Sequence, residues 1–426
     1  MLWITCLALI IGGVCSFVAL GLLRLIGLFT NLFFFQRLSS SFASPADSHL
    51  GLWIILVPVA GGALIGLMAR FGSDRIRGHG IPEALEAILF GKSKMSLKVA
   101  LLKPLSAAIS IGSGGPFGAE GPIIMTGGAF GSLLAQAFHL TASERKTLLV
   151  AGACAGMSAV FFSPIAATLL AVELLLFEMK PRSLVPVAAA SAAAAILRPY
   201  LLGPGPLFPV PVHPILPLRG LLFAVACGLI AGLASALLTK LVYLWEDFFQ
   251  KLPFHWAWFP AIGGLAVGIG GYFQPRTLGV GYDLIGGFLA GNIPNAQAAL
   301  LVLVKALIWA FALGSGTSGG VLAPLLIIGG GLGVAEGAFF PAEGGAGVWP
   351  LISMAAMLGG VMRVPFTALA FALELTHDTN VLLPLLIASV AAYATTVLTM
   401  KRSILTEKVA RRGFHVLREY AVDLLE

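Results

Sequence analysis

Long apolar stretches with very few charges dominate this sequence and restrict what it can fold into. Hydrophobic residues make up 58% of the chain and charged residues only 11%, against about 25% charged in soluble domains. At about 20 residues for each crossing, the stretches allow on the order of ten or more membrane helices. We therefore predict an all-α, polytopic integral membrane protein. Its apolar stretches include Leu2–Phe35, Leu52–Phe71, Leu148–Phe177, Leu221–Tyr243, Trp256–Phe273, Ala298–Leu313, Leu351–Leu373 and Val381–Met400.

The charges and cysteines argue against several classes of function. The formal net charge of +7 is assigned to cytoplasmic loops and tails, as the positive-inside rule predicts, and not to nucleic-acid binding. Cys6, Cys15, Cys154 and Cys227 lack CxxC spacing and are predicted to be packing residues, not disulfides or metal ligands. We expect no cofactor and no metal. The first apolar run is too long for a cleavable secretory signal and lacks a basic start.

One glycine-rich stretch stands apart, GSGGPFGAEGPIIMTGGAFG at Gly112–Gly131, because it carries a single carboxylate, Glu120. An ionisable side chain inside a membrane-embedded chain is costly, so it marks a functional site by default. The alternative is an acid in a solvated loop, which the small and apolar neighbours disfavour.

The chain contains an internal duplication. Gly112–Gly131 aligns with Gly314–Gly333, GSGTSGGVLAPLLIIGGGLG, at an offset of 314 − 112 = 202 residues, and Glu120 meets Leu322. Other landmarks repeat at 201 or 202: Lys103 and Lys305, Gly78 and Gly279, Gly80 and Gly281, Pro164 and Pro365, Glu173 and Glu374. We predict a first transmembrane repeat at 1–202, a proline-rich linker at 203–217 and a second repeat at 218–426.

Basic residues indicate that the two repeats are inverted, because lysine and arginine favour cytoplasmic loops. The matching region of the second copy, Gly270–Ala299, carries only Arg276. The loop around GHGIPE in the first copy is basic: Arg70, Arg75, Arg77, Lys92, Lys94 and Lys98. Inverted repeats place substrate sites near the membrane midplane, on broken helices at the repeat interface.

Both aligned glycine-rich stretches have the form of lead-ins to helix N-termini. Pro122 and Pro324 suit a first helical turn. A helix N-terminus offers unpaired N–H groups and a partial positive charge. Two such ends that face each other would form an electropositive cavity for an anion. The Glu120 carboxylate would occupy that cavity, and its protonation would release it, so Glu120 is predicted to be a gate and a proton acceptor.

Three motifs resemble those of the CLC family of chloride channels and chloride/proton antiporters. GHGIP at 78–82 resembles GSGIP, GAEGP at 118–122 resembles G(K/R)EGP, and GVLAP at 320–324 resembles GxFxP. The resemblance covers essentially the whole chain and is of the prokaryotic type, without C-terminal regulatory domains. It implies a CLC-type inverted repeat of tilted and broken helices and a homodimer with one anion pathway in each subunit.

The resemblance also implies partners and a location. The partners would be a small inorganic anion, protons and membrane lipid, without nucleic acid, in the plasma (inner) membrane of a prokaryote. Glu120 would be the gating glutamate. The anion would be bound by His79, Gly80, Ile81, Gly118, Ala119, Gly320, Val321, Leu322, Ala323 and Leu405.

Three of these positions depart from the family pattern. His79 replaces a serine that contacts the anion, Leu322 replaces the usual phenylalanine, and Leu405 stands where a tyrosine hydroxyl is common. Backbone N–H groups therefore remain as the main donors. Two roles stay open for His79, which either binds the anion or packs aside.

The route for protons is also left open. Leu174 occupies the position, directly after Glu173, where antiporters of the family usually carry a second proton-transfer glutamate. Glu173 and Glu178 either serve protons or are structural. Lys103 either attracts anions or snorkels to the interface. The protein is thus expected to be an anion/proton exchanger or a proton-sensitive anion channel.

Two other functions compete with anion transport. GTSG at Gly316–Gly319 fits an intramembrane serine protease with Ser318 as nucleophile, but that chemistry needs a histidine base within hydrogen-bond reach. We therefore expect the protein not to be an enzyme. The second alternative is a degenerate family member that no longer transports.

Overall fold

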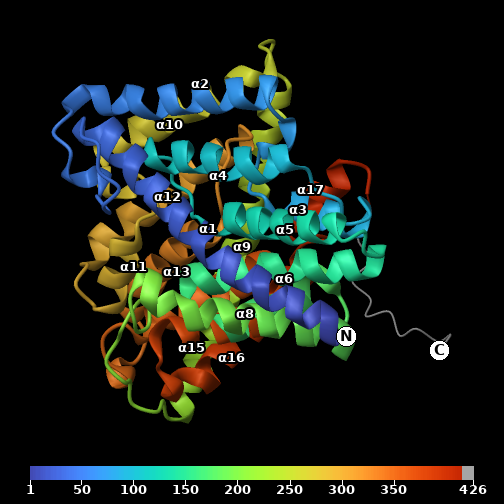
Figure 1. Ribbon diagram of the computed structural model, residues 1–426. Coiled ribbons are helices and arrows are strands. Elements are labelled where there is room, and N and C mark those ends of the chain that lie inside the picture. The colour runs from blue at the N-terminus through green and yellow to red at the C-terminus, as the bar shows by residue number, and fades with distance from the viewer. Residues whose placement is uncertain (415–426) are drawn as a thin grey trace.

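The computed structural model describes residues 1–414, and helices alone build the fold over that range (Figure 1). The first series of helices is α1 (Leu2–Phe35), α2 (Leu56–Phe71), α3 (Ile81–Leu89), α4 (Leu97–Gly112), α5 (Glu120–Ala137), α6 (Ala142–Phe161), α7 (Pro164–Leu170) and α8 (Pro181–Leu202). The second series is α9 (Leu218–Gln250), α10 (Phe259–Phe273), α11 (Tyr282–Leu289), α12 (Asn295–Gly314), α13 (Leu322–Gly337), α14 (Val348–Met362), α15 (Pro365–Thr376) and α16 (Leu382–Thr399), followed by α17 (Ile404–Arg411).

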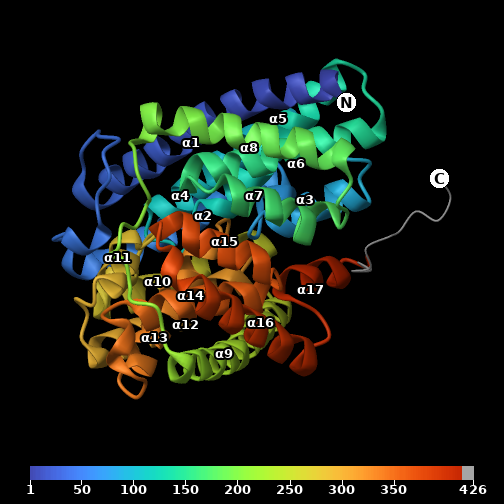
Figure 2. The same ribbon diagram turned by 90° about the horizontal axis from the view of Figure 1, so that it is seen from below.

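The two series repeat one order of long and short helices. The segment 203–217 between α8 and α9 contains no helix. The first series lies along one side of the molecule and the second along the other, with α17 next to α3 (Figure 2). Residues 415–426 of the predicted second repeat lie outside the described residues.

Six helices are long and apolar enough to cross a membrane within the described part of the chain: Leu2–Phe35, Gly51–Phe71, Pro181–Leu202, Leu218–Gln250, Asn295–Gly314 and Thr379–Arg411. Four apolar helices are shorter. The six long and four shorter apolar helices together agree with the expectation of about ten membrane helices, and α8 is one that the named stretches did not include.

Two of the expected stretches are broken, and prolines explain why. Leu148–Phe177 divides before Pro164 and Leu351–Leu373 divides before Pro365. Proline disfavours helical backbone in the residue before it, and Ser163 and Val364 have nearly the same non-helical conformation, with φ −127° and −131°. The break makes α7 and α15 separate short helices, each with an N-terminus of its own.

Contacts between the two series come in reciprocal pairs, as a two-fold axis generates. Glu374, at the end of α15, accepts hydrogen bonds from the N–H groups of Ile165 (2.9 Å) and Ala166 (2.8 Å) at the start of α7. Glu173, after α7, accepts from Phe366 N (3.1 Å) and Thr367 N (2.7 Å) at the start of α15. Each broken helix is thus capped by the equivalent carboxylate of the other series.

All four cysteines are free thiols, and only Cys6 is exposed. The other three lie buried in helices α1, α6 and α9. The burial of Cys15, Cys154 and Cys227 agrees with the predicted packing role, whereas the exposed Cys6 does not fit it.

The reciprocal caps generate a prediction for stability. Glu374→Ala leaves the Ile165 and Ala166 N–H groups without their acceptor, so the free energy of unfolding should fall by about 1–3 kcal/mol. The measurement is an SDS titration in mixed micelles. Glu178→Ala is the control, because Glu178 is partly exposed and contacts the side chains of Ser183 and Lys146, and it should cost less than about 1 kcal/mol. Equal losses in the two variants would contradict the capping role.

Candidate functional site

Helices α5 and α13 begin side by side at the interface between the two series. The Gly118 N–H donates to the Gly320 carbonyl (3.1 Å), and the Gly320 N–H donates to the Gly118 carbonyl (2.8 Å), which forms an isolated antiparallel bridge. This bridge holds the first turns of α5 and α13 against each other. N–H groups in a first turn have no partner within their own helix, so two sets of donors converge here.

Glu120 is the first residue of α5, and its side chain is fully buried. The carboxylate lies over the bridge, since a Cβ added at Gly118 or Gly320 would meet its oxygens. The nearest backbone donors are the N–H groups of Glu120 itself and of Ala323 in the first turn of α13. Neither satisfies the geometry of a hydrogen bond, and both carboxylate oxygens lack a partner. A buried carboxylate without a partner is costly, so this position is a candidate functional one.

The N-terminus of α3 reaches the same point. Gly80, its N-cap, has φ +89°, a left-handed conformation that favours glycine. Gly121 packs so closely that a Cβ there would collide with the His79 carbonyl oxygen. The predicted anion-binding segments around Gly80, Gly118 and Gly320 are therefore contiguous in space.

His79 is buried, and its Nδ1 atom has no hydrogen-bond partner. Beyond it, Glu83 accepts from the Gly80 N–H (2.9 Å) and pairs with Arg412 Nη2 (2.6 Å). Arg412 also pairs with Glu86 (2.8 Å). These contacts fix the backbone of the GHGIP loop and leave the imidazole as its one unsatisfied polar side chain.

Two buried lysines hold the equivalent loops of the two repeats. Lys103 Nζ donates to the carbonyls of Ile76 (2.9 Å) and Gly78 (2.7 Å). Lys305 Nζ donates to the carbonyls of Thr277 (2.9 Å) and Gly279 (2.8 Å). Both lysines are fully buried, so the interfacial snorkelling considered for Lys103 is wrong. Lys103 stabilises the loop that carries His79.

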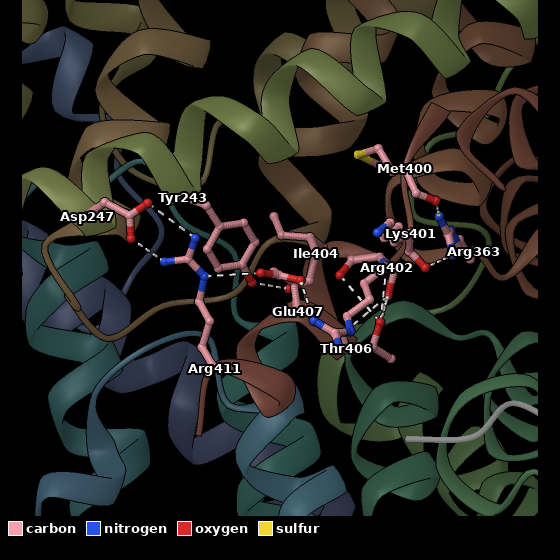
Figure 3. A network of polar contacts seen from close by, with 11 residues as sticks. Tyr243, Asp247, Arg363, Met400, Lys401, Arg402, Ile404, Thr406, Glu407 and Arg411 are labelled. Carbon is pink, nitrogen blue, oxygen red and sulfur yellow. Dashed lines mark hydrogen bonds and ion pairs between the residues drawn. The ribbon is translucent and has the colours of Figure 1, made fainter. Parts of the chain in front are cut away.

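Helix α17 contributes Leu405, which is fully buried in its first turn. The Tyr243 hydroxyl of α9 donates to the Ile404 carbonyl, and Arg411 pairs with Asp247 of α9 (Figure 3). These anchors fix the first and last residues of α17 against α9. Sequence reasoning missed Tyr243 and Asp247, because nothing in a local pattern pairs residues that lie more than 150 positions apart.

A second residue that sequence reasoning missed is Tyr282, the first residue of α11. Its ring packs edge-on against Phe161 (6.4 Å between centroids), and its hydroxyl has no hydrogen-bond partner. It lies within electrostatic reach of Glu120. The alignment of GVGYDL with GHGIPE could have pointed to it.

The acids considered for a proton route lie in different surroundings. Glu173 caps α15, and its carboxylate also accepts from Thr367 Oγ1 (2.6 Å). Glu178 is partly exposed, accepts from Ser183 Oγ (2.9 Å) and lies 3.9 Å from Lys146 Nζ. Leu174 is fully buried. The geometry favours the structural role for Glu173.

Ser318 has the surroundings of a packing residue. Its hydroxyl accepts a hydrogen bond from Ser106 (3.1 Å), and no histidine of residues 1–414 bonds it. The one buried histidine–carboxylate pair in that range, His213 and Asp378 (2.6 Å), directs its other ring nitrogen at the Ala346 carbonyl (2.9 Å). The protease alternative thus gains no support from the geometry.

Known proteins share this sequence pattern. Residues 61–397 match the family described as voltage gated chloride channel. A Ralstonia nicotianae protein named ClcB-like is 29% identical over 373 residues, which span 85% of this chain and 87% of that protein. A Yersinia pseudotuberculosis protein named H(+)/Cl(−) exchange transporter ClcA is 28% identical over 375 residues, which span 84% of this chain and 77% of that protein.

Solved structures share the fold. A slow cyanobacterial Cl−/H+ antiporter superposes with a TM-score of 0.86 at 21% identity, covering 96% of this chain and 97% of that chain. A CLC-type fluoride/proton antiporter superposes with a TM-score of 0.76 at 21% identity, covering 92% and 95%. The fold is that of a multi-pass integral membrane protein of the CLC type, as expected. The chain belongs to the voltage-gated chloride channel family.

The close approach of Gly121 to the α3 loop generates a prediction. Gly121→Ala should disrupt the meeting of the α3 and α5 N-termini, because its methyl group collides with the His79 carbonyl. We expect little folded protein by size-exclusion chromatography, or at least a tenfold loss of any transport. Gly286→Ala in α11 is the matched control, since a Cβ there has open space and alanine favours a helix. Normal folding and transport in Gly121→Ala would contradict the packing described.

Proposed function

We propose that the protein transports a small anion, chloride or a related ion, along a pathway that the Glu120 carboxylate opens and closes. The observation that carries the proposal is the fully buried, unpartnered carboxylate at the joined N-termini of α5 and α13. A negative group at this point occupies the place that converging N–H dipoles offer to an anion. Glu120 is thus a tethered competitor of the transported ion.

The donors along this pathway are backbone groups. The N–H groups of Ile81, Leu322 and Ala323 lie in the first turns of α3 and α13, whereas the Gly80 N–H already donates to Glu83 (2.9 Å). Dipoles attract an anion without the full charge of a lysine, so the ion binds and leaves again, which conduction and exchange both require. His79 adds an imidazole at the inner end of this path, and Leu405 and Val321 add apolar walls.

Protonation of Glu120 couples the pathway to protons. A neutral carboxyl group no longer competes for the anion site, so flux should rise as the pH falls. The names of the relatives, which include H(+)/Cl(−) exchange transporters, favour exchange of anion for proton. A proton-sensitive channel is the alternative, since Leu174 leaves the family's inner proton position without an acid.

The repeats, the assembly and the location complete the proposal. Residues 1–202 and 218–426 form two repeats inverted in the membrane, joined by 203–217. The reciprocal contacts of Glu173 and Glu374 support this arrangement. The protein acts as a homodimer with one pathway in each subunit, in the inner membrane of a prokaryote.

The gate is tested with purified protein in liposomes across an anion panel of halides, nitrate, bicarbonate and sulfate. Wild type should show flux that rises at low pH and should drive protons uphill when an anion gradient is imposed. Glu120→Gln should abolish both the pH dependence and the proton movement, because the amide carries no titratable proton.

Glu144→Gln is the control, since glutamine preserves the capping box with Thr141. It should behave as wild type. Unchanged pH dependence in Glu120→Gln would show that Glu120 is not the gate. Anion current without proton movement in wild type would identify a channel, and no flux of any anion would identify a member that does not transport.

His79 is predicted to set the preference among anions. His79→Ser replaces an unsatisfied imidazole with a hydroxyl donor, and one added hydrogen bond corresponds to about 1 kcal/mol, or about fivefold in relative affinity. Chloride flux relative to nitrate should therefore change severalfold while the dependence on Glu120 is retained. The same ratios in both proteins would mean that the imidazole packs aside.

A further inference from the structure

A cleft of about 430 Å³ lies outside the proposed anion pathway, where α9, α16 and α17 end together. Its walls include four cationic side chains, Lys240, Lys401, Arg402 and Arg411, and two acids, Asp247 and Glu407. Figure 3 shows Arg402 and Arg411 directed at Glu407 from two sides. The cleft has an excess of positive charge that the proposed transport function does not use.

The acids are already engaged by the two arginines. Arg411 pairs with Asp247 and with Glu407 (3.2 Å), and Arg402 lies 3.4 Å from Glu407. Lys240 and Lys401 have no carboxylate within ion-pair distance among residues 1–414, and both are exposed. Two unpaired ammonium groups at one cleft are complementary to an anionic ligand.

The positions of the charged residues along α9 and α16 indicate the level of the cleft in the membrane. In α9 the run Gly220–Thr239 carries no charged residue and separates Arg219 from Lys240. At 1.5 Å per residue this run is about 30 Å long, the thickness of the hydrocarbon core. α16 is likewise uncharged and is followed directly by Met400, Lys401 and Arg402. Both spans therefore place their basic residues at the level of the lipid headgroups.

The rim of the cleft is apolar on the membrane side. Leu237 of α9 and Leu398 of α16, which precede Lys240 and Lys401 in the chain, are both strongly exposed. Apolar side chains below a basic cleft suit acyl chains below a charged headgroup. A soluble anion would gain nothing from this rim.

We propose that this cleft binds the phosphodiester headgroup of an anionic phospholipid, with Lys240 and Lys401 as the phosphate ligands. Basic pockets between membrane helices at the cytoplasmic interface recognise such headgroups. Arg411 and Arg402 pair with Asp247 and Glu407, so they line the cleft but do not bind the phosphate. The acyl chains lie along Leu237 and Leu398. This site does not depend on which ion the protein carries.

The test is a titration of the full chain in detergent with phosphatidylglycerol, read by native mass spectrometry. Wild type should retain phosphatidylglycerol in preference to phosphatidylcholine, and excess inorganic phosphate should not displace it. Lys240→Gln with Lys401→Gln should weaken the apparent affinity by about tenfold or more, since each lysine near a lipid surface contributes on the order of 1 kcal/mol.

The matched control is Lys94→Gln with Lys98→Gln, which removes the same charge from exposed positions near α4, and it should change the affinity less than twofold. The single variants Lys240→Gln and Lys401→Gln, at about fivefold each, decide the question if the double variant does not fold. Equal losses in the two pairs, no loss in the first pair, or displacement of the lipid by inorganic phosphate would each overturn the proposal.

Discussion

The joined N-termini of α5 and α13 are the contact on which the site depends. The two backbone hydrogen bonds between Gly118 and Gly320 bring first-turn N–H groups of both helices to one buried point. Such donors are unsatisfied within their helices. The Glu120 carboxylate is the only charged group of the described chain that lies over this bridge. A carboxylate and a mobile anion are therefore alternative occupants of one place.

The rest of the fold holds this point in place by pairs of equivalent contacts. Lys103 and Lys305 bind the carbonyls of matching loops. Glu374 of the second series caps α7, and Glu173 of the first series caps α15. The proposed gate lies where the two copies differ, since Glu120 in one copy corresponds to Leu322 in the other. Much of the scaffold is symmetric, and the proposed gate is one departure from that symmetry.

Much of the fold and of the candidate site could be predicted from the sequence, because the duplication and the glycine and proline motifs can be read directly from it. The glycine-rich lead-ins predicted the starts of α5 and α13, and the repeated offset predicted that Glu120 has no counterpart. The prediction of continuous apolar stretches across Pro164 and Pro365 was wrong, because hydropathy alone does not reveal a helix break within an apolar run. The carbonyl ligands of Lys103 and the anchoring of α17 by Tyr243 depend on contacts between distant segments, which no local pattern specifies.

The central claim is that Glu120 and the transported anion compete for the N–H groups at the α5 and α13 N-termini. The most direct measurement is the anomalous scattering of bromide in crystals of Glu120→Gln and of wild type at high pH. The account predicts a bromide peak within hydrogen-bond distance of the Ala323 N–H in the variant, at the place where wild type holds its carboxylate. Bromide absent from that place in the variant, or present beside an ionised carboxylate there in wild type, would contradict it.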